Sequence, residues 1–261
     1  MNRIQSKFKE LQKARKKALI TFITAGDPNL AVTEKLVYSL ESAGADLIEL
    51  GVPFSDPMAD GPIIQKSSER ALRSKTSLKS ILRLVSKIRK KSEIPILLMG
   101  YYNPILQQGP SKFCKEAKAV GVDGLIVVDL PPEESFELHR LAKKFGIHLI
   151  YLLTPTADKN RIQKIKKLAS GFVYYVSMTG ITGGKLTNLS FIRTHIQKIK
   201  RSISLPVCIG FGIRTPEQAQ KISKFADGVV VGSSLVSLTE RFKKSASSPI
   251  ARLVKRIKKT L

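Results

Sequence analysis

Short apolar segments alternate with longer segments of helical periodicity along the whole chain. The apolar segments hold five to seven residues each and lack the strict alternation of a half-exposed sheet. Such runs are typical of parallel strands that are buried on both faces. They predict strands at 18–24, 46–50, 94–100, 124–129, 148–153, 172–177, 205–210 and 228–232.

The intervening segments place apolar residues at i, i+3 and i+4, with charged residues on the opposite face. Clear examples are 30–45, 77–92, 131–146 and 216–226, and several such segments end in glycine, as helices prefer. Eight strand-helix units predict a closed α/β barrel, a single (β/α)8 TIM barrel with an extra N-terminal helix. An open, doubly wound sheet is the alternative. No linker divides the 261 residues, so we expect one domain over 1–261.

A short phrase recurs at 43–50, 120–129 and 224–232: a helix end, an aspartate and then a strand. In a barrel its aspartates would lie at the amino-terminal ends of strands, which is the face associated with stability. Glu49 stands at the carboxyl end of the second strand, where barrel active sites are built. The spacing therefore separates a structural acid, Asp46, from a candidate catalytic acid, Glu49.

Glycines follow the last two predicted strands, in the segments CIGFGI (208–213) and VVVGSS (229–234). Gly210, Gly212 and Gly232 would let backbone N–H groups approach an anion, and Ser233 would open a helix whose first N–H groups are free. In this type of barrel, the loops after strands 7 and 8 usually form the phosphate-binding site. A glycine-rich segment at 178–185 follows strand 6 and is expected to close over the site.

Two carboxylates are the best candidates for chemistry. Glu49 is flanked by apolar residues, which would raise its pKa toward the range useful for proton transfer. Asp60 lies in a Gly/Pro-flanked loop and is expected to remain an anion. The alternatives are a strand acid paired with lysine for Glu49 and a loop cap for Asp60, while Asp56 fits a turn former. Of Tyr174 and Tyr175, alternation sends only one inward.

The remaining chemistry-bearing residues fit ordinary structural positions. His139 and His195 fall on helical faces and His148 at the entering end of a strand. No His/Cys/Asp/Glu cluster has metal-ligand spacing, so no metal is expected. Cys114 and Cys208 form no CxxC pair, which favours reduced thiols in a cytoplasmic protein.

The net charge of +25 is concentrated at the two ends of the chain. Residues 1–17 carry seven Lys/Arg and one acid, and residues 241–261 carry eight basic residues and no acid. The basic residues are not interleaved with aromatic ones, as a base-stacking surface would require. The last segment also keeps apolar residues at helical spacing. We therefore expect a solvated basic face that binds neither nucleic acid nor membrane. The alternative is that the basic ends contact nucleic acid or an anionic membrane.

Several segments together resemble the tryptophan synthase α-subunit family over nearly the whole chain. They are TAGDP (24–28), ELGVPFSDPMADGPIIQ (49–65), MGYYNPIL (99–106), GVDGLIVVDLPPEES (121–135), TGITG (179–183), GFGI (210–213) and GSSLV (232–236). The resemblance implies a lyase of tryptophan biosynthesis that cleaves indole-3-glycerol phosphate to indole and glyceraldehyde 3-phosphate. One departure is Met178, where the family usually has a basic residue.

The resemblance also implies roles for individual residues. Glu49 would act as acid and base, Asp60 would stabilise positive charge on the indole nitrogen, and Tyr174 would orient Glu49. Phe211, Ile63 and Leu98 would wall the indole pocket. The remaining substrate and phosphate contacts would come from Thr182, Gly183, Gly210, Gly212, Gly232 and Ser233.

The family further implies a partner. The chain would pair with a pyridoxal-phosphate β subunit in an α2β2 assembly, and would itself need no cofactor. Loop residues 53–60 and 103–104 would face that partner. Two other functions stay open: a different phosphosugar-handling barrel enzyme, and a non-catalytic activator of a β subunit.

Overall fold

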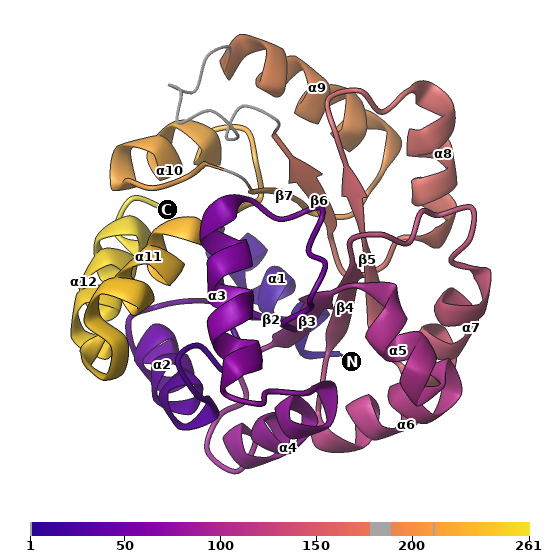
Figure 1. The fold of residues 1–261 in the computed structure, drawn as a ribbon. Helices are drawn as coiled ribbons and strands as arrows, with labels where there is room; N and C mark the ends of the chain where they lie inside the picture. Colours follow the sequence, from indigo (N-terminus) through magenta and orange to yellow (C-terminus); the bar gives the residue numbers. More distant parts are fainter. Residues whose placement is uncertain (1, 178–188, 211) are drawn as a thin grey trace.

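The strands form a closed parallel barrel in the computed structural model, which describes residues 2–177, 189–210 and 212–261 (Figure 1). Within this part, eight strands follow one another around the barrel in chain order, and β1 pairs with β8 to close it. The strands are β1 (Ala18–Thr24), β2 (Leu47–Gly51), β3 (Ile96–Gly100), β4 (Gly124–Val127), β5 (His148–Leu153), β6 (Val173–Val176), β7 (Val207–Gly210) and β8 (Gly228–Val231). The predicted barrel is confirmed, and the open sheet is excluded.

Helices surround the barrel as an outer ring (Figure 1). The ring is formed by α2 (Leu30–Ser42), α3 (Pro62–Arg73), α4 (Leu78–Ile88), α5 (Tyr102–Gln108), α6 (Pro110–Val120), α7 (Phe136–Phe145), α8 (Lys159–Leu168), α9 (Leu189–Ser202), α10 (Pro216–Ser223), α11 (Ser233–Phe242) and α12 (Ser247–Lys258). Helix α1 (Arg3–Lys13) lies inside the ring, at one end of the barrel. Capping boxes at Ser77 and Thr215 start α4 and α10. Left-handed Gly121 and Gly146 end α6 and α7, as the glycine endings in the sequence predict. None of the helices in the described ranges is long and apolar enough to cross a membrane.

Side chains of the strands divide between two apolar layers. One layer fills the barrel and takes its residues from alternate strand positions: Ala18, Ile20, Leu47, Leu97, Ile126, Ile150, Tyr174, Cys208 and Val230. The other layer lies between the strands and the outer helices. The predicted N-terminal helix, α1, packs Ile4, Phe8 and Leu11 against the interior layer, with the Phe8 and Phe172 rings 5.6 Å apart. Helix α1 therefore adds an apolar layer to the barrel interior.

The three recurring aspartates tie neighbouring strands together at the amino-terminal face. Each carboxylate accepts a hydrogen bond from a backbone N–H at the start of an adjacent strand: Asp46 from Leu19 (2.7 Å), Asp123 from Ile96 (3.0 Å) and Asp227 from Val207 (2.9 Å). Each also pairs with a cation, Lys258, Arg89 and Lys200 respectively. Their predicted structural role fits this geometry, since a buried carboxylate needs such partners.

Candidate active site

Strand alternation aims Glu49 into the barrel. Leu47 belongs to the interior layer, and Glu49 follows it by two positions on β2. Glu49 pairs in register with Phe22 on β1 and with Leu97 on β3. Because side chains two apart share a face of a strand, Glu49 lies above Leu47 toward the carboxyl-terminal end of the barrel.

The carboxyl group of Glu49 is completely buried. Neither of its oxygens has a hydrogen-bond partner among the described residues. Burial raises the pKa of Glu49 to about 8. The pairing with lysine that would make it a structural strand acid is not present in the described residues. This burial favours the neutral form of the Glu49 carboxyl near neutrality.

Tyr174 is the inward-facing tyrosine of β6. It belongs to the interior layer, whereas Tyr175 packs in the layer between strands and helices. Burial raises the pKa of Tyr174 well above its usual range, and the nearby charge of Glu49 adds to this effect. A Cβ at Gly210 would lie 2.1 Å from the Tyr174 hydroxyl, so only glycine fits there. Gly210 thus makes room for Tyr174, a role that the sequence did not reveal.

Asp60 lies in the loop between β2 and α3, held by its neighbours. The Tyr101 hydroxyl donates to Oδ2 of Asp60 at 3.1 Å and accepts from the Ala59 N–H at 2.9 Å. The Gln65 side chain donates to the Asp60 carbonyl at 2.8 Å. Burial raises the pKa of Asp60 to about 6, against the opposing effect of the Tyr101 hydrogen bond. Asp60 is therefore mainly an anion only above about pH 6, whereas an exposed aspartate would ionise at lower pH.

Phe22 connects the surroundings of Asp60 with the predicted phosphate glycines. It lines a small cavity together with Asp60, Met99 and Tyr101. A Cβ at Gly51 would lie 2.5 Å from the tip of the Phe22 ring, and a Cβ at Gly232 would lie 3.2 Å from its Cβ. Phe22 and Tyr101 were missed by sequence reasoning. In the sequence, only the paired tyrosines of MGYYNPIL drew attention to Tyr101. Phe22 lies in the apolar run 18–24, where it cannot be told from an ordinary core residue.

Two predicted wall residues, Leu98 and Ile63, do not line the small Asp60 cavity. Leu98 faces the layer between strands and helices, and its neighbour Met99 lines the Asp60 cavity. On α3, Ile64 lines this cavity and Ile63 does not. A continuously apolar strand does not reveal which alternate positions face inward, so Leu98 and Met99 could not be told apart from the pattern alone.

The predicted anion-binding residues lie at the ends of β7 and β8. Gly212 has φ +80°, a left-handed conformation that favours glycine. Gly232 precedes α11, whose first residue is Ser233, and no side chain caps this helix end. The Ser234 hydroxyl is buried without a hydrogen-bond partner among the described residues. An uncapped helix start with a spare buried hydroxyl suits an anion.

Four residues of interest lie outside the described residues: Thr182, Gly183, Phe211 and Met178. Their predicted roles stay predictions. Among the residues that are described, no group of three His, Cys, Asp or Glu side chains is arranged to hold a metal.

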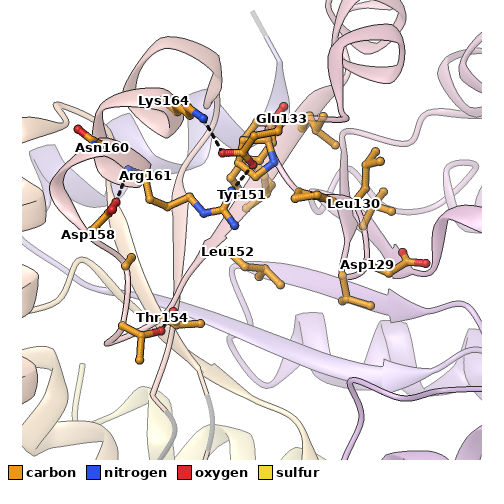
Figure 2. Close-up of a pocket in the computed structure, with 18 residues that line it drawn as sticks. Asp129, Leu130, Glu133, Tyr151, Leu152, Thr154, Asp158, Asn160, Arg161 and Lys164 are labelled. Atoms are coloured by element: carbon orange, nitrogen blue, oxygen red, sulfur yellow. Dashed lines mark hydrogen bonds and ion pairs between the residues drawn. The ribbon is translucent and has the colours of Figure 1, made fainter.

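A larger cavity of about 750 Å³ opens over the carboxyl ends of β4 and β5. Figure 2 shows Glu133 beside Arg161 and Lys164 of α8, with which it forms ion pairs, Lys164 at 2.9 Å. Glu49 and Asp60 do not line this cavity. Val128 is a lining residue of both this cavity and the small Asp60 cavity.

Comparison with known proteins gives a consistent result. The family model described as tryptophan synthase alpha chain matches residues 8–260. A tryptophan synthase alpha chain from Geotalea daltonii is 56% identical over 242 residues, which cover 93% of this chain and 92% of the relative. The crystal structure of tryptophan synthase subunit alpha from Legionella pneumophila str. Paris superposes with a TM-score of 0.93 at 40% identity, covering 100% of this chain and 98% of that one. A structure of the tryptophan synthase α2β2 complex from Pyrococcus furiosus matches with a TM-score of 0.87 at 38% identity, covering 92% and 97%.

Proposed function

The chain belongs to the tryptophan synthase alpha chain family, and we propose that within its α-subunit role in tryptophan biosynthesis Glu49 and Asp60 carry out the chemistry. The reaction is the lyase cleavage of indole-3-glycerol phosphate to indole and glyceraldehyde 3-phosphate. One observation carries the assignment of residues. A fully buried carboxylic acid, unpartnered among the described residues, stands at the carboxyl end of a barrel strand with a pKa of about 8.

Glu49 acts first as an acid and then as a base. Its proton goes to C3 of the indole ring, which makes the bond between C3 and the side-chain carbon ready to break. The electrons of that bond restore the aromatic ring, and the hydroxyl proton of the side chain passes to the Glu49 carboxylate. The aldehyde forms, and Glu49 ends as it began, so atoms and charge balance. The raised pKa keeps Glu49 protonated near neutrality, as the first step needs.

Asp60 stabilises the charge that this protonation creates. Protonation at C3 places positive charge on the ring nitrogen, whose N–H then donates to the Asp60 carboxylate. Tyr101 donates to Oδ2 of Asp60, which leaves Oδ1 for the indole N–H. The side chains of Phe22 and Met99 near Asp60 support this placement, since aromatic and apolar neighbours suit an indole ring.

The phosphate of the substrate is proposed to bind at the start of α11. Gly232, Ser233 and Gly212 supply the close backbone approach, and the spare hydroxyl of Ser234 adds a donor. Phe22 touches the Gly232 side of this region and the Asp60 cavity, which supports one substrate reaching both. Gly183, Gly210, Thr182 and Phe211 remain proposed contacts.

A β subunit is the proposed partner, and its pyridoxal phosphate would not belong to this chain. The related Pyrococcus furiosus structure is that of an α2β2 complex. Three exposed apolar side chains follow the carboxyl ends of consecutive strands: Met58 (91% exposed), Leu106 (51%) and Phe136 (75%). Their position beside the site supports docking there, and the 53–60 and 103–104 loops are proposed to take part. One domain and a cytoplasmic location stay predictions.

Release of indole from indole-3-glycerol phosphate tests the function, with and without added tryptophan synthase β subunit. The purified chain should release indole slowly alone and faster with the β subunit. Acceleration of the β reaction without any indole release would instead favour the non-catalytic activator. Turnover of another phosphosugar in place of this substrate would favour the other barrel enzyme.

A further inference from the structure

A second cavity lies at the opposite end of the barrel from Glu49. Its volume is about 490 Å³, within the range of small-molecule sites. It is bounded by the ends of α6, α7 and α8, by the start of β5 and by the start of α1. The lining includes three lysines, Lys118, Lys143 and Lys167, and two histidines, His139 and His148.

The charge around this cavity has one sign. Lys118, Lys143 and Lys167, the three cavity lysines, come from three different helices, and no aspartate or glutamate is among the described lining residues. Each of the three helix ends contributes about half a negative charge, which three full positive charges more than offset. Lys118 reaches over Gly146, where its Nζ would lie 3.6 Å from an added Cβ. The cavity therefore holds a net positive charge.

His148 gives the wall of this cavity an unsatisfied polar group. Only 9% of the residue is exposed, and its Nε2 has no hydrogen-bond partner among the described residues. Burial lowers the pKa of His148, and the charge of Lys118 lowers it further. Leaving a buried imidazole nitrogen unpaired costs free energy, which a bound partner would recover. Gln5 and Ser170 add neutral polar groups to the lining, whereas the Asn2 amide already donates to the Asp123 and Gly146 carbonyls.

We propose that this cavity is a binding site for a small oxyanion that carries at least two negative charges. Three lysines on separate helices supply the charge for such an anion, and the Gln5 amide and the Ser170 hydroxyl supply further hydrogen bonds. Phosphate esters and polycarboxylates share this chemistry. The site lies on the stability face of the barrel, so it is separate from the proposed phosphate site at α11.

Histidine NMR on the full-length chain tests the proposal, because three histidines serve as separate probes. His139 and His148 line the cavity, whereas His195 lies on α9 and packs against Phe191 with ring centroids 4.3 Å apart. Pyrophosphate and citrate are titrated into isotope-labelled protein at constant pH and ionic strength. The His139 and His148 resonances should shift and saturate, while His195 stays in place. If just one of the two anions saturates the shifts, its phosphate or carboxylate group is the one that the site prefers.

Charge variants separate a built site from general attraction. The cavity variant carries Lys118→Met, Lys143→Met and Lys167→Met. The control carries Lys35→Met, Lys79→Met and Lys255→Met, which remove the same charge from exposed positions on α2, α4 and α12. Since charge-assisted hydrogen bonds are strong, affinity should fall at least about tenfold in the cavity variant and less than about twofold in the control.

Three results would overturn the proposal. Equal losses in both variants would mean that overall charge attracts the anion. Shifts that appear with heparin but with neither small anion would indicate an extended polyanion surface. Loss of the shifts in Gly232→Asp, which blocks the proposed active-site phosphate position, would mean that the anion acts from there. Shifts that persist in that variant support a second site, whatever the outcome for the active site.

Discussion

Replacing Glu49 with glutamine should stabilise the fold, and the gain should grow with pH. The buried carboxyl has a pKa of about 8 against an ordinary value of 4.5. Above pH 4.5 the unfolded chain therefore releases a proton that the folded chain keeps. The stability that this acid contributes is fully present below pH 4.5 and is lost as the pH rises toward 8. Glutamine is neutral in both states and lacks this loss.

The size of the effect follows from the pKa shift. Linkage gives a slope that approaches about 1.4 kcal/mol per pH unit between the two pKa values. The free energy of unfolding of Glu49→Gln should therefore rise by about 2.5 kcal/mol relative to wild type between pH 5 and pH 7. Using the difference between the two proteins removes the contributions of all other titrating groups. The unpaired amide of glutamine shifts the whole curve by a constant and leaves the slope unchanged.

Urea unfolding at pH 5, 6 and 7 measures this slope for both proteins. Glu69→Gln, an exposed change on α3, is the matched control and should give a flat difference within about 0.5 kcal/mol. A flat difference for Glu49→Gln as well would refute the reasoning. It would mean that Glu49 has the same pKa in the folded protein as in the unfolded chain. Glu49 would then be ionised near neutrality and could not act as the acid.

Three other changes test separate parts of the account. Asp60→Asn should lower kcat, because it should remove roughly 2–4 kcal/mol of transition-state stabilisation. A profile of kcat against pH should also no longer show the loss of activity below about pH 6. An unchanged kcat with a raised KM would make Asp60 a binding residue. Gly232→Asp should abolish binding of glycerol 3-phosphate in calorimetry by adding a like charge at the start of α11, and retained affinity would place the phosphate elsewhere. Deletion from Lys255 onward removes the Lys258 partner of buried Asp46 and should cost at least about 3 kcal/mol in urea unfolding. Glycerol 3-phosphate affinity should stay within about twofold in that deletion, since screening limits the reach of the lost charges.

Much of the fold was predictable because buried parallel strands have a strong pattern. The predicted strand 18–24 matches β1, and 148–153 matches β5, residue for residue. The recurring aspartates predicted the amino-terminal face, where Asp46 binds the β1 backbone. The amphipathic last segment predicted α12, whose Ile257 is completely buried.

The site was less predictable, and the reasons are physical. The position of Glu49 followed from its place at a strand end, since a charge in an apolar strand is costly without a use. The choice between Leu98 and Met99 failed because both residues are apolar and only pairing geometry decides which one faces inward. Burial in the folded protein raises the pKa of Asp60, and the hydrogen bond from Tyr101, which is distant in sequence, opposes that rise. No local pattern carries that information.

The most direct test of the central claim is kcat for indole formation by Glu49→Gln, with glycerol 3-phosphate affinity measured on the same sample. A positioned acid and base contributes about 10²–10⁴-fold, and Glu49 serves two proton transfers. We predict a fall in kcat of at least about a hundredfold, with phosphate affinity unchanged. A fall of less than about tenfold, in a variant that still binds glycerol 3-phosphate, would contradict the assignment of Glu49 as the acid and base.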